Sequence, residues 1–119
     1  MPKNKPKWVR KQKYSKEFEV IKEKKYHDVK DFKFDTGCYT LVKIYKRTKQ
    51  IGVAICDYNH HILKEFRGKS ARDLYRTILD YDKEHKRNWF NRMDHAAYLG
   101  KELKKAEISL AMGTDYVQE

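Results

Sequence analysis

Three short runs of β-branched and aromatic residues follow one another along the middle of the chain. They are Cys38 to Lys46, Ile51 to Tyr58 and Ile62 to Arg67, and only four and then three residues separate them. Residues of these types favour strands, and connections this short join antiparallel neighbours. The chain therefore predicts a three-stranded antiparallel meander, and this restricts its fold more than any other feature does.

Two helices are predicted after the strands. In the first, Ser70 is a good N-cap and Asp73 completes a pattern similar to a capping box. An apolar stripe at helical spacing follows, made of Leu74, Tyr75, Ile78 and Leu79. The polar stretch 80–88 either extends this helix or forms a charged loop.

The last helix carries the clearest boundary signals. Asp94 is predicted as its N-cap and Gly113 as the left-handed residue that ends it. Its apolar stripe recurs at i, i+4, i+7 and i+11, with Leu99, Leu103, Ala106 and Leu110. Residues 116–118 could add a short strand to the sheet. Two helices on one face of a small antiparallel sheet form an α+β layer, so we expect an α+β fold.

Basic residues are concentrated at the N-terminus of this chain, whose net charge is +11. Residues 1–16 contain seven Lys or Arg and no acid, residues 17–34 five of each sign, and residues 35–119 sixteen basic and twelve acidic side chains. Residues 1–15 have two prolines and no apolar periodicity, and are predicted to be a disordered basic tail. Residues 16–34 fit an amphipathic linker or a short helix.

Aromatic residues among the basic ones make this tail a candidate for nucleic acid binding, because cations displace counterions from phosphates and rings stack on bases. The candidate residues are Lys3, Lys5, Lys7, Trp8, Arg10, Lys11, Lys13 and Tyr14. A second candidate patch contains Lys86, Arg87, Trp89 and Arg92. For the tail, an acidic protein partner or no partner also stays open, and Trp89 could instead cover the core.

The sequence from Met93 to Glu119, MDHAAYLGKELKKAEISLAMGTDYVQE, resembles the signature of an uncharacterised archaeal domain family. That signature reads D-H-A-A-Y-L-G-x-E-L-x-K-A-E-x-x-L, followed by G and then Y-V-Q-D or Y-V-Q-E. Gly68-Lys69-Ser70-Ala71 followed by Leu74-Tyr75 is similar to another segment of the same family. The resemblance covers residues 35–119, which we take as the α+β domain. The family also occurs fused to archaeal pterin-binding proteins related to dihydropteroate synthase, and to proteins similar to thymidylate synthase. The resemblance therefore implies a link to one-carbon cofactors such as methanopterin.

Three polar residues share one stripe of the last predicted helix. His95, Tyr98 and Glu102 stand at i, i+3 and i+7, beside the apolar face. An imidazole, a phenol and a carboxylate could hold a polar ligand or move a proton. Alternatively, Tyr98 and Glu102 could tie the helix to the sheet by hydrogen bonds. Glu107 could pair with a group on the core side in the same way.

Other classes of site lack their signatures. A metal site needs three or four convergent ligands, whereas the adjacent pair His60-His61 diverges in an extended chain. The sequence has no H-E-x-x-H motif and no Gly-rich phosphate loop, so we expect no metal, no cofactor and no catalytic residue. Cys38 and Cys56 lie in neighbouring predicted strands and could form a disulfide, but buried thiols are the expected state. No apolar run is long enough for a membrane span and no signal peptide is recognisable, so a cytoplasmic protein is expected.

We therefore expect a non-catalytic binding module that engages RNA or a ribonucleoprotein through its basic tail. The alternative is an accessory domain or subunit of archaeal one-carbon metabolism, which binds a pterin cofactor or a partner enzyme through the helix from His95 to Glu102. A catalyst that uses these two residues is a third hypothesis.

Overall fold

The fold is described here from a computed structural model, for residues 37–57, 59–87, 89–90 and 93–119. The predicted basic tail, the amphipathic segment 16–34 and Arg92 lie outside the described residues.

The three predicted strands form one antiparallel sheet. They are β1 (Cys38–Tyr45), β2 (Gln50–Asp57) and β3 (Ile62–Gly68), in the order β1-β2-β3. In the centre of the sheet Val42 is opposite Val53, and Val53 is opposite Phe66. The register shifts between Ile55 and Cys56, where β2 pairs with β3. The predicted meander is confirmed.

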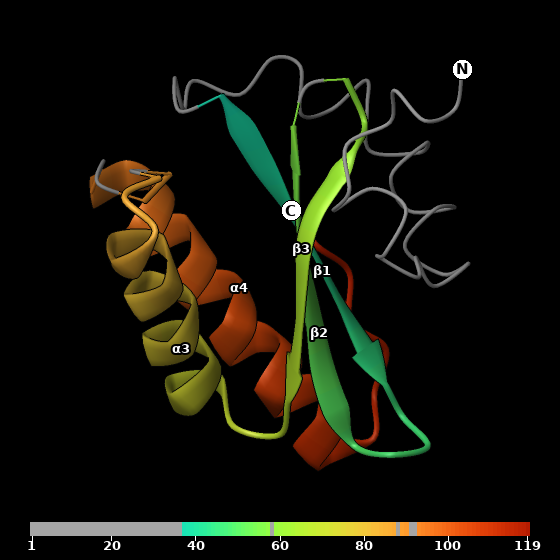
Figure 1. Cartoon of the computed structure of the whole chain (residues 1–119). Helices are drawn as coiled ribbons and strands as arrows, with labels where there is room; N and C mark the ends of the chain where they lie inside the picture. The colour runs from blue at the N-terminus through green and yellow to red at the C-terminus, as the bar shows by residue number, and fades with distance from the viewer. Residues whose placement is uncertain (1–36, 58, 88, 91–92) are drawn as a thin grey trace.

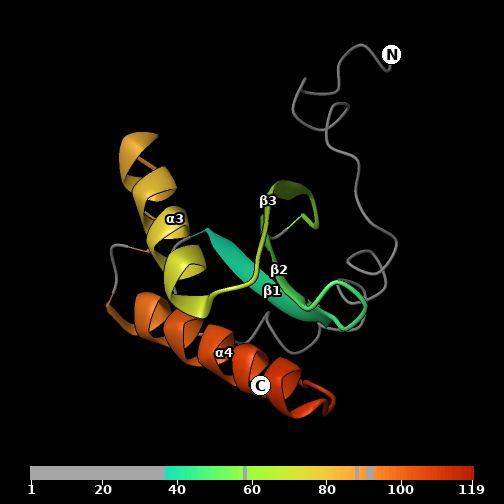
Figure 2. The same cartoon turned by 90° about the horizontal axis from the view of Figure 1, so that it is seen from below.

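Both predicted helices pack on the same face of this sheet, as Figures 1 and 2 show. The first, α3 (Ala71–Glu84), begins after Ser70, whose hydroxyl accepts a hydrogen bond of 3.2 Å from the backbone N–H of Asp73. The N-cap prediction is therefore confirmed. The polar stretch after residue 80 extends the helix only as far as Glu84, and a turn follows.

The second helix is α4 (Met93–Met112). With Asp94 as its N-cap it was expected to begin at residue 95, so it begins two residues earlier than predicted. Asp94 lies inside its first turn, so its prediction as the N-cap is wrong, although a carboxylate at this end still faces the positive end of the helix dipole. Gly113 has a φ of 73° and ends the helix as predicted. The N–H of Gly113 bonds to the Leu110 carbonyl and the N–H of Thr114 to the Ser109 carbonyl, which is a Schellman motif.

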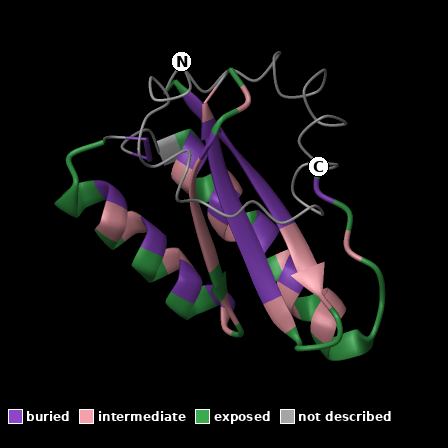
Figure 3. Cartoon of the chain, turned by 45° about the vertical axis from the view of Figure 1, so that its right-hand side comes forward, coloured by how far each residue is buried: buried purple, intermediate pink, exposed green. Residues whose placement is uncertain are grey.

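The main core lies between the sheet and the two helices (Figure 3). The strands supply alternate residues to it, and the helices supply the predicted apolar stripes, including Leu74, Ile78, Leu99 and Leu103. The other alternate residues of the sheet form a second, fully buried cluster, made of Tyr39, Leu41, Ala54, Cys56 and Ile62. Cys38 belongs to the first cluster and Cys56 to the second, and both are buried thiols as expected.

Residues 116–118 do not form the short strand that the sequence suggested. They run beside β1 with irregular backbone. The side chain of Gln118 makes hydrogen bonds to the β1 backbone that a paired strand would otherwise make. In the part of the chain described here, no helix is long and apolar enough to cross a membrane.

Candidate functional site

The chain after α4 folds back along the helix it has just left. Gly113 reverses its direction, and hydrogen bonds from three residues along α4 then hold it in place. Ser109 Oγ donates to the Asp115 carbonyl, Lys105 Nζ to the Val117 carbonyl, and Tyr98 OH to the backbone oxygen of Glu119, the last at 2.7 Å. We call residues 114–119 the return segment.

Gln118 joins the return segment to the edge of β1 that faces away from β2. Its Oε1 accepts a 2.8 Å hydrogen bond from the Val42 N–H, and its Nε2 donates at 2.9 Å to the Thr40 carbonyl. Nε2 also donates to Tyr98 OH at 2.7 Å. Only 6% of Gln118 is exposed. One side-chain amide therefore satisfies two backbone groups of β1 and links them to α4.

Glu102 lies fully buried below the return segment. Its Oε1 accepts a 2.5 Å hydrogen bond from Tyr116 OH and lies 3.5 Å from Lys105 Nζ. Burial, and next the hydrogen bond to Glu102, raise the pKa of Tyr116. Burial likewise raises the pKa of Tyr98 to about 12. Both phenols therefore stay protonated near neutral pH and act as hydrogen-bond donors.

His95 is the third member of the predicted stripe and is also fully buried. Its Nδ1 lies 3.1 Å from the Trp89 carbonyl, which requires the proton to be on Nδ1, and its ring lies 4.6 Å from the Phe90 ring. Burial lowers its pKa to about 4, against the smaller raising effects of the Trp89 carbonyl and Asp82. The imidazole is therefore neutral at pH 7.

Asp82 belongs to the same region and was not recognised from the sequence. It is buried, and its two carboxylate oxygens accept hydrogen bonds from the backbone N–H groups of Trp89 (2.7 Å) and Phe90 (3.3 Å). It extends the α3 stripe of Leu74 and Ile78 by a further four residues. That spacing was a signal that this carboxylate faces the core.

Glu107 reaches from α4 to the start of α3. Its Oε2 accepts a 3.1 Å hydrogen bond from the N–H of Ala71, and its Oε1 lies 3.6 Å from Lys104 Nζ. A carboxylate at a helix N-terminus is favourable for the helix dipole. Glu107 therefore ties the two helices together.

The second basic patch proposed from the sequence is only partly assembled. Lys86 and Arg87 are exposed, and the Arg87 guanidinium lies 5.6 Å from the centre of the Trp89 ring. Trp89, however, belongs to the main core, is 8% exposed, and stacks on Tyr81. It covers the core, so its ring faces are not open to a base. The tail residues Lys3 to Tyr14 and Arg92 lie outside the described residues.

The polar stripe of α4 is thus directed inward and is bonded to the chain's own atoms. No group of three or more potential metal ligands occurs among the residues that the structure describes. The outer side of α4 is different. Ile108 and Met112, four residues apart on this helix, are 47% and 69% exposed, and Val117 on the return segment is 74% exposed.

Comparison with known proteins gives the family. The family model PterinBD-DUF4346 matches residues 11–119, and so begins before residue 35, where the motif resemblance starts. The chain is 31% identical over 85 residues to Uncharacterized protein MJ0107 of Methanocaldococcus jannaschii. That alignment covers 71% of this chain and 15% of the relative, so the chain spans only a small part of the length of that protein. No solved structure shows a significant match. The chain belongs to the PterinBD-DUF4346 family, a domain of unknown function associated with pterin-binding proteins.

Proposed function

We propose that this chain is a non-catalytic accessory domain of pterin-linked one-carbon metabolism, which docks on a pterin-binding protein through the outer side of α4. Membership of a family associated with pterin-binding proteins supports the choice of partner. The matched relative is several times longer than this chain, as expected for a domain that also works beside other domains.

The observation that carries the proposal is the division of α4 into two sides. On one side Gln118 binds Tyr98 and Tyr116 binds Glu102, whereas on the other side Ile108 and Met112 face outward. Small soluble domains gain nothing from exposing large apolar side chains close together, and such groups often mark protein interfaces. Exposed Lys101 and Lys104 on the same helix supply the polar rim that an interface usually has.

The titratable groups support a role without catalysis. A general acid or base works best with a pKa near the operating pH. The pKa of His95 is about 4 and that of Tyr98 about 12, and both side chains are committed to hydrogen bonds within the chain. The alternative hypothesis from the sequence placed the contact on the polar stripe. We now assign that stripe to holding α4 in position and the contact to the opposite side of the same helix.

The test is a binding measurement with a recombinant pterin-binding protein, related to dihydropteroate synthase, from the same organism. Isothermal titration calorimetry with the full chain should give a measurable dissociation constant. Met112→Glu should weaken it about tenfold or more, because burying a charge in an apolar contact is costly. Thr77→Glu is the matched control, since it adds the same charge at an exposed position of α3 and should leave binding unchanged.

Absence of binding, or equal loss in both variants, would contradict the proposal. The absorbance spectrum of the purified full chain then tests the RNA hypothesis. Copurified nucleic acid that salt removes would support binding through the basic residues 1–16.

A further inference from the structure

A surface pocket at the β1–β2 end of the sheet is lined by an unusual number of cations. Its volume is about 520 Å³, within the usual range for small-molecule sites. The lining residues are Lys43, Ile44, Tyr45, Lys46, Arg47, Thr48 and Arg67. Four of these are basic, and none of the described lining residues is acidic. We call it the hairpin pocket.

Tyr45 organises the positive charge of this pocket. The Arg67 guanidinium carbon lies 3.6 Å from the centre of the Tyr45 ring, and Lys43 Nζ lies 4.6 Å from it. Contact with the ring face holds the planar guanidinium in a fixed orientation and leaves its N–H edge available. The Tyr45 ring therefore gathers two positive charges at one side of the pocket.

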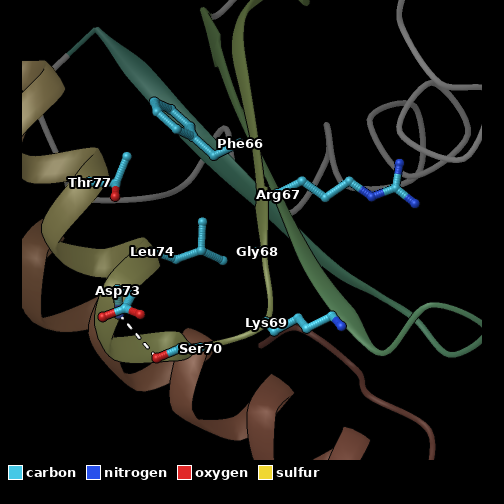
Figure 4. A pocket seen from close by; sticks show the side chains of 8 residues that line it. All are labelled: Phe66, Arg67, Gly68, Lys69, Ser70, Asp73, Leu74 and Thr77. Atoms are coloured by element: carbon cyan, nitrogen blue, oxygen red, sulfur yellow. Dashed lines mark hydrogen bonds between the residues drawn. The ribbon is translucent and has the colours of Figure 1, made fainter.

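The neighbouring pocket on the α3 side, which Arg67 also lines, has a different composition. That pocket has a volume of about 280 Å³ and is lined by Asp73 and by the N-cap Ser70, among others. Figure 4 shows Asp73 and Thr77 on α3, while Arg67 and Lys69 extend away from that helix, toward the other side of the sheet. Within the hairpin pocket, Lys46 pairs with Asp115 of the return segment. For Arg47 and Arg67, the described contacts include no carboxylate partner.

We propose that the hairpin pocket is a binding site for the phosphate group of a small phosphorylated ligand. Arg67 would bind two phosphate oxygens through its guanidinium edge, with Tyr45 holding its plane. Lys43 and Arg47 add positive charge, and the Thr48 hydroxyl can donate a further hydrogen bond. At about 520 Å³ the pocket is larger than a phosphate ion requires, so it leaves room for an organic part of the ligand. This site is separate from the outer side of α4 and does not depend on the proposed docking.

The experiment titrates the full chain with matched probes in low salt, followed by two-dimensional amide NMR. Guanosine 5′-monophosphate should shift the resonances of β1, the 46–49 turn and Arg67, and guanosine at equal concentration should not. Arg67→Met keeps an unbranched side chain but removes the charge, and should weaken binding about tenfold, the usual worth of a charged hydrogen bond. Arg67→Lys keeps the charge but loses the planar, bidentate guanidinium. It should bind more tightly than Arg67→Met and less tightly than the wild type.

Arg76→Met on the exposed side of α3 is the control for loss of one positive charge, and it should bind like the wild type. Equal weakening in the two Met variants would show a diffuse charge effect and overturn the proposal. So would absence of shifts at about 10 mM ligand, a concentration that would largely fill even a site with a dissociation constant of about 1 mM.

A single-stranded RNA oligomer separates the two sources of phosphate. If RNA binds far more tightly than the mononucleotide, with a salt slope of about 0.7 for each of several phosphates, and Arg67→Met weakens that binding, the pocket serves RNA and the small-ligand assignment is wrong.

Discussion

Burial lowers the pKa of His95, and this makes the stability of the fold depend on pH. The folded-state pKa is about 4 and the ordinary value is 6.5, because the buried ring is costly to charge. Between these two pH values the unfolded chain binds a proton that the folded chain does not. This contribution to stability is therefore complete above pH 6.5 and is lost as the pH falls toward 4.

We expect the free energy of unfolding to decrease by up to about 3 kcal/mol between pH 6.5 and pH 4 as a result of this one group. His95→Asn retains a donor for the Trp89 carbonyl and does not titrate in this range. The variant should be less stable at pH 7, since it loses ring packing, but its stability should change less with pH. Urea unfolding at several pH values measures the slope, and an equal slope in both proteins would assign the pH effect to other groups.

At the scale of elements, Gln118 contributes more than any other residue to holding the return segment against β1 and α4. Gln118 makes three hydrogen bonds from a buried position and satisfies both backbone groups of β1 that face it. Its neighbour Val117 points outward. The alternation along the segment resembles that of a strand, although its backbone does not pair with the sheet.

Gln118→Leu keeps the side-chain volume and removes those hydrogen bonds. It leaves the Val42 N–H and the Thr40 carbonyl buried without that partner, which should cost about 2–4 kcal/mol of unfolding free energy. Val117→Ala, at the adjacent exposed position, should cost less than about 0.5 kcal/mol. Denaturant unfolding of the two variants checks this difference. Similar stability for Gln118→Leu and the wild type would mean that β1 does not depend on the return segment.

At the scale of the whole molecule, both faces of the sheet carry buried clusters, so the domain could extend N-terminally beyond β1. The helices α3 and α4 cover one face, and the cluster of Tyr39, Leu41 and Ile62 is fully buried on the other. The family match starts at residue 11, so residues 16–34 belong to the family region. Seven apolar or aromatic side chains occur in that stretch, namely Phe18, Val20, Ile21, Tyr26, Val29, Phe32 and Phe34.

Two shortened chains test this organisation. A chain that starts at Lys16 should melt close to the full-length chain, because residues 1–15 lack apolar periodicity and their loss should change stability by less than about 0.5 kcal/mol. A chain that starts at Asp35 should melt at a clearly lower temperature, because it lacks apolar residues that belong to the family region. Thermal unfolding followed by circular dichroism compares them. A large loss in the first chain would show that the basic segment is packed on the domain.

The sequence alone was sufficient to predict the three strands and the two helices, although not every boundary, because their signals are local. Period-two and helical patterns, the Ser70 cap and the positive φ of Gly113 each depend on residues within a few positions of one another. It also placed His95, Tyr98 and Glu102 on one stripe of α4. It could not show that these side chains would be bound within the chain rather than open to a ligand. Tyr116 and Gln118, which bind Glu102 and Tyr98, lie 14 and 20 positions away.

Gln118 reaches groups on β1 that are 76 and 78 positions away. Its glutamine side chain carries no local sign of that role, and the same residues were read as a short strand. The hairpin pocket was missed for a related reason. Lys43 and Tyr45 lie two residues apart on β1, whereas Arg67 lies on β3, and only the pairing of both strands with β2 brings Arg67 to the Tyr45 ring. Local periodicity determines which segments become strands and helices. Tertiary packing determines which distant side chains come into contact.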